Sequence, residues 1–343
     1  MEKKVVIDNH IGKPYEITVR LANSDDVDKI IMLLHLCYGD LCSDTSMYDK
    51  HILAYDITTG KKNIVVAEKD KEIIALESCC DDKYFEKTIL LKTQITAPAY
   101  RKAGVNKAIV DYIFTEFDLT HWNSAYAYAI TNNSVSQHTS IAKGFEMTGM
   151  IFNSFMASEL LSAGDNCSVP KPKRTHAVII KNILLKEVGD LFVPTYLHQI
   201  FRAVYNTLKV KFTLVGDADT PPIYGESTQY VFLDNAFHHN CEIIVNRVGS
   251  DLNNIVHTIE SKHGKNPLQT YNLFLNSKDK DAIAGFHILS KLGYVFTGIK
   301  PLGNNAEYLI MYHSENVKID TKNCLIHPYY QEIAQNFFDL LHN

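Results

Sequence analysis

The chain has 343 residues, of which 46% are hydrophobic and 10% aromatic, and its formal net charge is −5 at pH 7. This length and apolar content suffice for two domains of ordinary size and exclude a disordered chain. The acidic balance argues against a nucleic-acid-binding protein, because such proteins normally concentrate a basic surplus on one face.

Membrane insertion and disulfide stabilisation are also disfavoured. No apolar run reaches the length of a membrane-spanning helix, and the start at Met1–Lys4 lacks the apolar core of a signal peptide. The seven cysteines include no C-x-x-C pair, which favours reduced, mostly buried thiols. We therefore expect a soluble cytoplasmic protein with neither a membrane nor a nucleic-acid partner.

The predicted elements begin with a strand at Ile17–Ala22, followed by a capped helix that starts within Ser24–Val27. A later β-type run ends at Pro98, and the basic turn Arg101–Lys107 leads into an amphipathic helix. Apolar residues recur in that helix at steps of three and four: Val105, Ile109, Tyr112, Ile113 and Phe117. A glycine-containing turn at a helix N-terminus directs backbone N–H groups at one point, as a pyrophosphate requires. We call Arg101–Lys107 the phosphate cradle.

Three further elements follow this helix. Ala125–Ile130 alternates like a strand, Thr131–Ser134 caps a short helix, and Gly144–Met150 opens another strand. This order resembles the GNAT N-acetyltransferase superfamily, whose acyl-CoA motif Gln/Arg-x-x-Gly-x-Gly/Ala is similar to Arg101–Asn106, except that Asn106 replaces a small residue. The resemblance covers about half of the chain, from Ile17 to Leu185. It implies an α/β (α+β) fold with a mixed, mostly antiparallel sheet flanked by helices.

The sequence also repeats internally. Gly293–Ile299 matches Gly144–Met150 in its glycine, aromatic, apolar and threonine positions, which indicates two related lobes unless the likeness arose by chance. In the second lobe we expect a strand, a helix and a final strand at Gln269–Leu275, Ser277–Leu292 and Glu307–Tyr312.

The second lobe lacks a comparable cradle. The corresponding stretch, Cys241–Leu252, holds one glycine, one arginine and Asp251 at the expected helix start, where a carboxylate would take the place of an anion. We therefore expect a degenerate lobe, acting as a supporting wall or a homodimer surface. The predicted domains are a catalytic domain at 1–186, a connecting helix at 187–209 and the degenerate domain at 210–343.

The family resemblance implies a reaction and a set of binding residues. In such enzymes an amine attacks the thioester of acetyl-CoA directly in a ternary complex, so acetyl-CoA is a co-substrate and no metal is needed. The acceptor is an amine on a small molecule or a protein, and the sequence fixes neither its identity nor the acyl chain length. The implied cofactor-binding residues are Gln94, Ile95, Thr96, Arg101, Lys102, Ala103, Gly104, Val105, Asn106, Lys107 and Asn133.

The proton-handling residues are less well defined. Where the family commonly has a tyrosine four residues before the Gly-Phe pair, this chain has Ser140, so water, His138, Tyr126 or Tyr128 would protonate the thiolate. Glu77, in an apolar strand beside the motif strand, is the candidate base, because burial would raise its pKa; it could equally be an exposed residue on an edge strand.

The sequence admits other interpretations. A catalytically silent CoA-binding or regulatory protein with the same fold is the alternative to the enzyme, favoured by Ser140 and Asn106. A zinc site at His238–Cys241 is disfavoured, because neighbouring strand residues face opposite ways and no second ligand cluster follows. The basic run Lys171–Arg174 is interpreted as a solvated loop.

Overall fold

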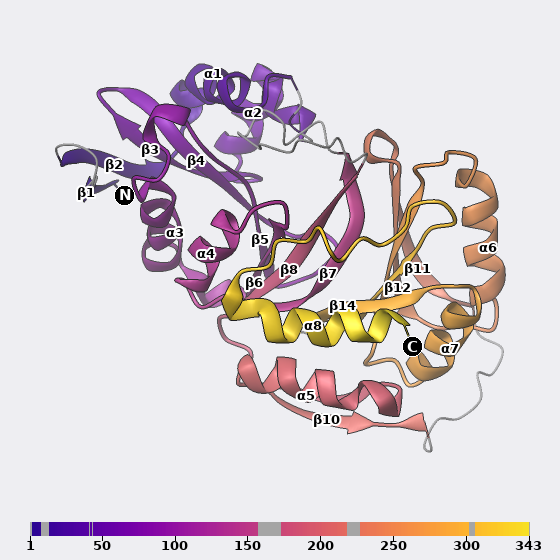
Figure 1. The fold of residues 1–343 in the computed structure, drawn as a ribbon. Helices are drawn as coiled ribbons and strands as arrows, with labels where there is room; N and C mark the ends of the chain where they lie inside the picture. Colours follow the sequence, from indigo (N-terminus) through magenta and orange to yellow (C-terminus); the bar gives the residue numbers. More distant parts are fainter. Residues whose placement is uncertain are drawn as a thin grey trace. The chain divides into compact units, whose positions relative to one another are not determined.

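The chain divides into two compact units in the computed structural model, which describes residues 2–7, 14–40, 42, 44–156, 173–217, 227–301 and 306–342 (Figure 1). Unit 1 comprises Met1–Trp122 and Ser158–Ser168, and unit 2 comprises Asn123–Ala157 and Val169–Asn343. Among the described residues, every helix is too short or too polar to span a bilayer.

Unit 1 contains a five-stranded antiparallel sheet in which each strand pairs with its sequence neighbour. Its strands are β1 (Glu2–Ile7), β2 (Tyr15–Leu21), β3 (Asn63–Lys69), β4 (Glu72–Asp81) and β5 (Thr88–Thr96). Its helices are α1 (Val27–Tyr38), α2 (Lys50–Thr58) and α3 (Val105–Glu116). The strand expected at Ile17–Ala22 is β2, and the sheet additionally contains β1 outside it.

The helices of unit 1 cover both faces of this sheet (Figure 1). On one face α1 and α2 pack against Ile64, Val66 and Leu76. Asn23 and Asp26 form a reciprocal capping box at the helical turn that leads into α1. The polar run before Val27 predicts such a cap. On the other face α3 packs against β3, β4 and β5.

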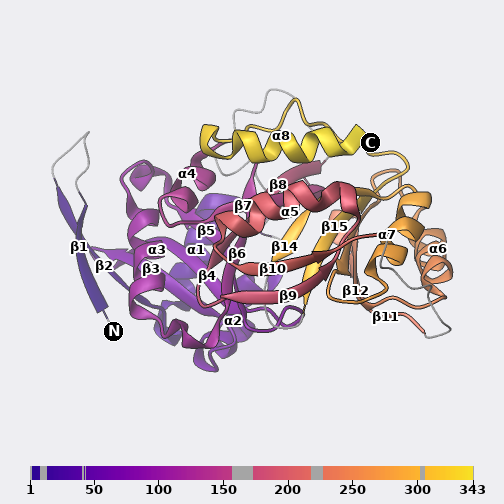
Figure 2. The ribbon, with the colours of Figure 1, turned by 90° about the horizontal axis from the view of Figure 1, so that it is seen from below.

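Unit 2 is built on an eight-stranded sheet with the neighbour order β6-β8-β7-β14-β15-β13-β12-β11. Among the described residues, β12 and β13 run parallel to each other, and all other neighbouring strands of this sheet are antiparallel. Its strands are β6 (Ser124–Ile130), β7 (Glu146–Met156), β8 (Lys173–Asn182), β11 (Gln229–Asn235), β12 (Asn240–Arg247), β13 (Thr270–Asn276), β14 (Val295–Pro301) and β15 (Glu307–His313). A separate parallel pair is formed by β9 (Glu187–Phe192) and β10 (Lys211–Val215), which run beside α5 (Figure 2).

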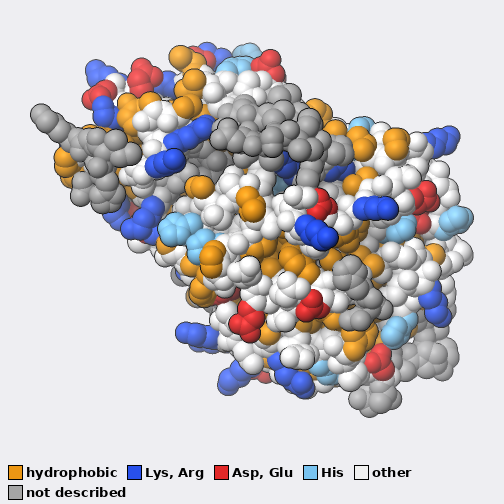
Figure 3. Space-filling view, viewed as in Figure 1, with side chains coloured by type: hydrophobic (Ala, Val, Ile, Leu, Met, Phe, Trp, Pro, Cys, Tyr) orange, Lys and Arg blue, Asp and Glu red, His pale blue; other side chains and the backbone are white. Residues whose placement is uncertain are grey.

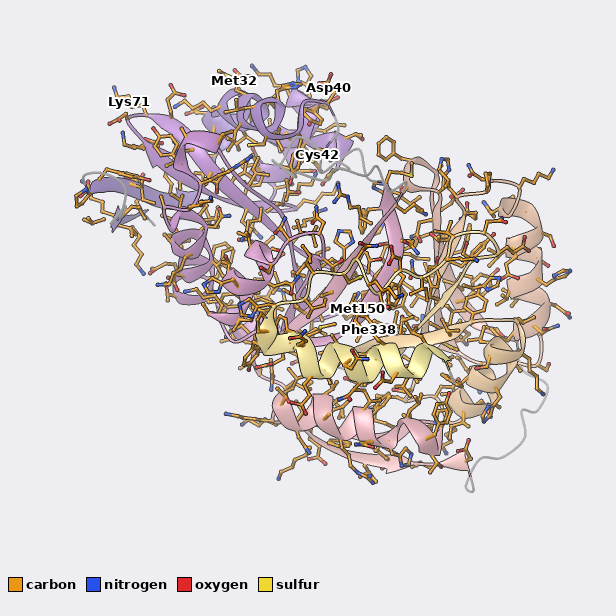
Figure 4. The ribbon with its side chains drawn as sticks, in the orientation of Figure 1. Met32, Asp40, Cys42, Lys71, Met150 and Phe338 are labelled. Atoms are coloured by element: carbon orange, nitrogen blue, oxygen red, sulfur yellow. The ribbon has the colours of Figure 1, made fainter. Side chains whose placement is uncertain are left out.

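Five helices belong to unit 2: α4 (Val135–Ile141), α5 (His198–Thr207), α6 (Leu252–His263), α7 (Ala282–Lys291) and α8 (Gln331–Asp339). Helices α5 and α8 pack against each other and against β7 and β14, and α6 packs against α7. Figure 4 labels Met150 on β7 and Phe338 on α8, the helix that covers that strand. Leu252, Val256 and Phe286 share one core with alternate residues of β12, β13 and β15.

The internal repeat has a structural counterpart. The succession β6-α4-β7-β8 is matched by β13-α7-β14-β15, and in both sets the last strand lies between the other two and pairs antiparallel with each. The two repeats meet where β7 pairs antiparallel with β14, at Gly149 opposite Gly298. A Cβ on Gly149 would lie 2.5 Å from the Gly298 Cα, so only glycine allows this approach. The expected fold class is confirmed, and the repeated topology agrees with the expected duplication.

Three expectations need correction. The stretch 187–209 is not one helix, because Glu187–Phe192 forms β9 and α5 begins only at His198. The helix expected from Ser277 begins at Ala282. Lys173 and Arg174 are not part of a solvated loop: both are buried in β8, and burial lowers the pKa of Lys173 to about 7. Lys171 and Pro172 lie outside the described residues.

Candidate functional site

The phosphate cradle occupies the turn between β5 and α3 in unit 1. Gly104 is the N-cap residue of α3 with φ 84° and ψ 6°, a left-handed conformation that glycine adopts without strain. A Cβ added to Gly104 would meet nothing within 4 Å, so the space above its backbone is open. Lys102, Gly104 and Lys107 are exposed. The turn therefore presents two cations and a helix N-terminus to an approaching anion.

The other cradle residues fix the turn's conformation. The side chains of Ala103 and Val105 are buried, so only their backbones are left to face a ligand. The Arg101 Nε donates to the Thr96 carbonyl at 3.2 Å, and the Thr96 hydroxyl donates to the Asn106 Oδ1 at 2.5 Å. Asn106, which departs from the family motif, thus ties the first turn of α3 to the end of β5. The Arg101 Nε is likewise bonded to the end of β5, through the Thr96 carbonyl.

A β-bulge interrupts β5 beside the cradle. Thr93 and Gln94 together lie opposite the single residue Glu77 of β4, while Lys92 pairs with Ser78 and Ile95 with Leu76. Thr93 has φ 53°, a rare conformation for a β-branched residue. A bulge turns backbone groups out of the ladder and re-aims a side chain. Here it brings the Gln94 amide against Glu77, where Nε2 donates to Oε2 at 2.9 Å.

Glu77 lies on the face of the sheet that α3 covers. It is two residues from Ala75, so the two share a face, and Ala75 pairs with Thr96, whose hydroxyl contacts α3. Only 3% of Glu77 is exposed, which rules out the exposed edge-strand alternative. Burial raises the pKa of Glu77 to about 7, and the opposing effect of the Gln94 hydrogen bond is smaller. A carboxyl with this pKa can accept a proton near neutral pH.

The remaining predicted residues belong to unit 2. The Tyr128 hydroxyl oxygen accepts a hydrogen bond from the Lys300 Nζ at 3.1 Å. Lys300 is fully buried, and its Nζ lies 4.0 Å from the ring centroid of Tyr126 and 5.1 Å from that of Phe274. This buried lysine comes from the second lobe, and nothing in its local sequence distinguishes it from a surface lysine.

Around α4 the predicted residues are mostly occupied in building the helix. The Asn133 Oδ1 accepts from the Val135 N–H at 3.0 Å, and the Ser140 hydroxyl donates to the Ser136 carbonyl at 2.9 Å. His138 is exposed, with its ring centroid 5.6 Å from that of His327. Gln137, which the sequence did not single out, is fully buried and bonds through its side chain to Ile130, Asn133, Leu325 and His327.

In the second lobe, the turn before α6 is filled by the protein's own groups. The Val248 N–H donates to the Asp279 carboxylate at 2.5 Å, and the Gly249 N–H donates to the Thr228 hydroxyl at 2.9 Å. The strands on either side of α6, β12 and β13, are paired from Asn240 and Thr270 to Val245 and Leu275. The acidic side chain that takes one of these donors is Asp279 and not Asp251, the residue expected from the sequence, whose Oδ1 instead accepts from the Thr228 N–H at 2.7 Å.

On the face seen in Figure 3, Lys and Arg side chains are interspersed with Asp and Glu.

One group of metal-capable side chains is present in unit 2, formed by Asp234, Cys241 and His263. Of the segment His238–Cys241, only Cys241 takes part. The His238 Nδ1 accepts from the Met156 N–H at 3.2 Å, and the His239 Nδ1 lies 3.1 Å from the Asn266 Nδ2.

No protein-family model and no curated protein matches this chain. Among solved structures it is similar to a ribosomal-protein-alanine N-acetyltransferase from Brucella melitensis, with 13% identity over 48% of this chain and 99% of the other at a TM-score of 0.38. It is also similar to the PaiA N-acetyltransferase from Thermoplasma acidophilum in complex with coenzyme A, with 14% identity over 49% and 99% at a TM-score of 0.35.

A third similar structure is a putative acetyltransferase from Salmonella typhimurium with its cofactor acetyl-CoA, with 13% identity over 48% of this chain and 93% of the other at a TM-score of 0.38. Each of these likenesses covers about half of this chain. At these identities and TM-scores the likeness assigns neither an activity nor a residue. The candidate site stands on the contacts of its own residues.

Proposed function

We propose that this protein transfers an acetyl or other acyl group from acyl-CoA to an amine by direct attack, with the reaction carried by the first lobe, residues 1–186. The observation that carries the proposal is the exposed turn at the start of α3. There an open, left-handed Gly104 is flanked by the exposed Lys102 and Lys107. Such a turn suits the pyrophosphate of coenzyme A, because backbone N–H groups, the helix dipole and two cations act at one point.

The chemistry of the proposal rests on Glu77. A carboxyl whose pKa is about 7 can take the proton of the attacking ammonium, directly or through one water. The bulge at Thr93–Gln94 would direct backbone N–H groups of β5 at the thioester carbonyl and stabilise the developing oxyanion. Protonation of the thiolate by water, His138, Tyr126 or Tyr128 remains a prediction. The acceptor is an amine on a small molecule or a protein.

The test compares Gly104→Val with Gly60→Val. Both glycines are exposed and have positive φ (84° and 71°), and a Cβ added to either would meet nothing within 4 Å, so the two substitutions strain the backbone alike. We expect Gly104→Val to lose coenzyme A binding in calorimetry, because a branched side chain would fill the phosphate's place, and Gly60→Val to keep it.

The same proteins are then assayed for thiol release from acetyl-CoA with a panel of amines. The parent and Gly60→Val should release thiol with at least one amine, and Gly104→Val should not. If Gly104→Val binds coenzyme A as the parent does, the cradle is ordinary surface and the proposal fails. If the parent binds coenzyme A but no amine gives thiol release, the protein is a binding module and the enzymatic proposal fails.

A further inference from the structure

Three metal-capable side chains from three separate elements of unit 2 converge on one point. They are Asp234 of β11, Cys241 of β12 and His263, the last residue of α6, and their ligand atoms all lie within 4.8 Å of one another. Asp234 and Cys241 are directly opposite each other in the β11–β12 ladder, so both point to the same face of the sheet. The spacing of these three residues in the sequence matches no metal-binding motif, so the sequence does not predict this group.

The separation between the His263 and Asp234 ligand atoms fits tetrahedral coordination. A zinc ion binds histidine nitrogen and carboxylate oxygen at about 2.0–2.2 Å, so two such ligands in tetrahedral geometry stand roughly 3.4 Å apart. The His263 Nδ1 lies 3.5 Å from the Asp234 Oδ2, close to that separation before any ion draws them together.

The surroundings of each group also suit a metal. The Gln269 Nε2 donates to the Cys241 Sγ at 3.3 Å, a contact of the kind that steadies a thiolate ligand. The Phe232 ring lies against the His263 ring, with centroids 5.2 Å apart, and restricts its orientation. Cys241 is fully buried, whereas the side chains of His263 and Asp234 are 15% and 42% exposed. Of the three groups, the Asp234 carboxylate is thus the most accessible to an ion from solvent.

We propose that Asp234, Cys241 and His263 form a zinc-binding site in the second lobe, with the Cys241 thiol losing its proton to solvent as the Zn²⁺–S bond forms. Sulfur, imidazole nitrogen and carboxylate oxygen together select a borderline-soft divalent ion over Mg²⁺ or Ca²⁺. The site departs from the expectation of a protein without a metal. It is also independent of the acyl transfer proposed for the first lobe.

Cobalt is the probe, because Co²⁺ occupies zinc sites and a Co²⁺–thiolate bond gives a charge-transfer absorption in the near ultraviolet. The full chain is stripped with a chelator and titrated with Co²⁺. We expect this absorption in the parent, its displacement by added Zn²⁺, and its loss in Cys241→Ser. The matched control is Cys324→Ser, another free cysteine of unit 2 that lies outside the group and should keep the signal.

His263→Gln leaves the thiol in place and should weaken Co²⁺ binding roughly tenfold or more, since loss of a ligand costs at least as much as loss of a supporting contact. Zinc should also raise the melting temperature of the parent but not of Cys241→Ser, whose folding is checked by circular dichroism. The proposal is overturned if Co²⁺ gives no thiolate absorption, if Cys241→Ser keeps it, or if His263→Gln binds Co²⁺ as tightly as the parent. In that case His263 and Asp234 are a surface ion pair beside a buried thiol.

Discussion

Glu77 is the residue whose environment most directly sets a pH dependence. If it takes the proton of the amine, Glu77→Gln should lower turnover about a hundredfold or more at neutral pH while acetyl-CoA affinity stays nearly unchanged. The rate should partly recover at high pH, where the amine loses its proton unaided. Steady-state thiol release across pH measures this. Glu72→Gln, an exposed carboxylate on the same strand, is the control. Unaltered turnover in Glu77→Gln would remove Glu77 from the mechanism.

The same substitution should stabilise the protein above pH 7. The pKa of Glu77 is raised from 4.5 to about 7, so the folded state holds the proton more tightly and the free energy of unfolding falls as pH rises between these values. At 1.36 kcal/mol per pKa unit, the loss above pH 7 is up to about 3 kcal/mol.

Glutamine carries no charge and can still accept from Gln94, so Glu77→Gln should have a flat profile through this window. Denaturant unfolding at pH 5 and pH 8 checks it. A parent protein as stable at pH 8 as at pH 5, with Glu77→Gln no different, would contradict the raised pKa. Loss of activity together with a gain of stability would mark Glu77 as a functional residue held at a structural cost.

Single residues show where prediction from the sequence stops. Glu77 could be placed, because one carboxylate in an apolar run is visible in the sequence and burial follows from the run. Thr93 could not, since a bulge depends on the register between β4 and β5, which the sequence of one strand does not contain. The buried position of Lys173 could not be predicted for a similar reason. Its Nζ donates to the carbonyls of His239 and Leu268 and to the Thr270 hydroxyl, all distant in sequence.

At the scale of elements, the glycines that the two repeats share have structural roles. Gly144 and Gly293 follow α4 and α7 with φ values of 74° and 88°, so each ends its helix in the left-handed conformation. Gly149 and Gly298 let β7 and β14 approach at their single pairing point. The glycines repeated in the sequence therefore stand where the backbone conformation or the approach of two strands requires glycine.

Gly149→Ala tests this contact. The added Cβ would lie 2.5 Å from the Gly298 Cα, a backbone atom that can move only if a strand moves, so we expect a loss of about 2–3 kcal/mol in the free energy of unfolding. Gly298→Ala should cost a similar amount, because its Cβ would lie 2.4 Å from the Gly149 Cα. Denaturant unfolding measures both. If either variant is as stable as the parent, β7 and β14 do not approach as described.

Elements with a strong apolar period were predictable, and those defined by pairing were not. The helix after the cradle, expected from its periodicity, is α3 (Val105–Glu116), and the expected alternating strand is β6. By contrast, Glu187–Phe192 was expected to be helical and is β9. It pairs in parallel with β10, the strand that follows α5 in the sequence. A six-residue run carries too little periodicity to separate a strand from a helix, and its partner lies about twenty residues further on.

At the scale of the whole molecule, one structural plan occurs twice with different consequences. The first lobe keeps an exposed cradle, whereas the turn before α6 in the second lobe has its N–H groups taken by Asp279 and Thr228. In addition, β12 and β13 pair in parallel through six residue pairs, from Asn240 and Thr270 to Val245 and Leu275.

This difference predicts the stoichiometry of coenzyme A. Calorimetry on the full chain should give one equivalent per chain, because only the first cradle presents unoccupied space and cations to a pyrophosphate among the described residues. Gly104→Val should lose that equivalent. Asp279→Ala, which frees the Val248 N–H, should not add a second one, since the Gly249 N–H is still taken by the Thr228 hydroxyl. Two equivalents in the parent, or one remaining in Gly104→Val, would show that the second lobe binds coenzyme A and is not degenerate.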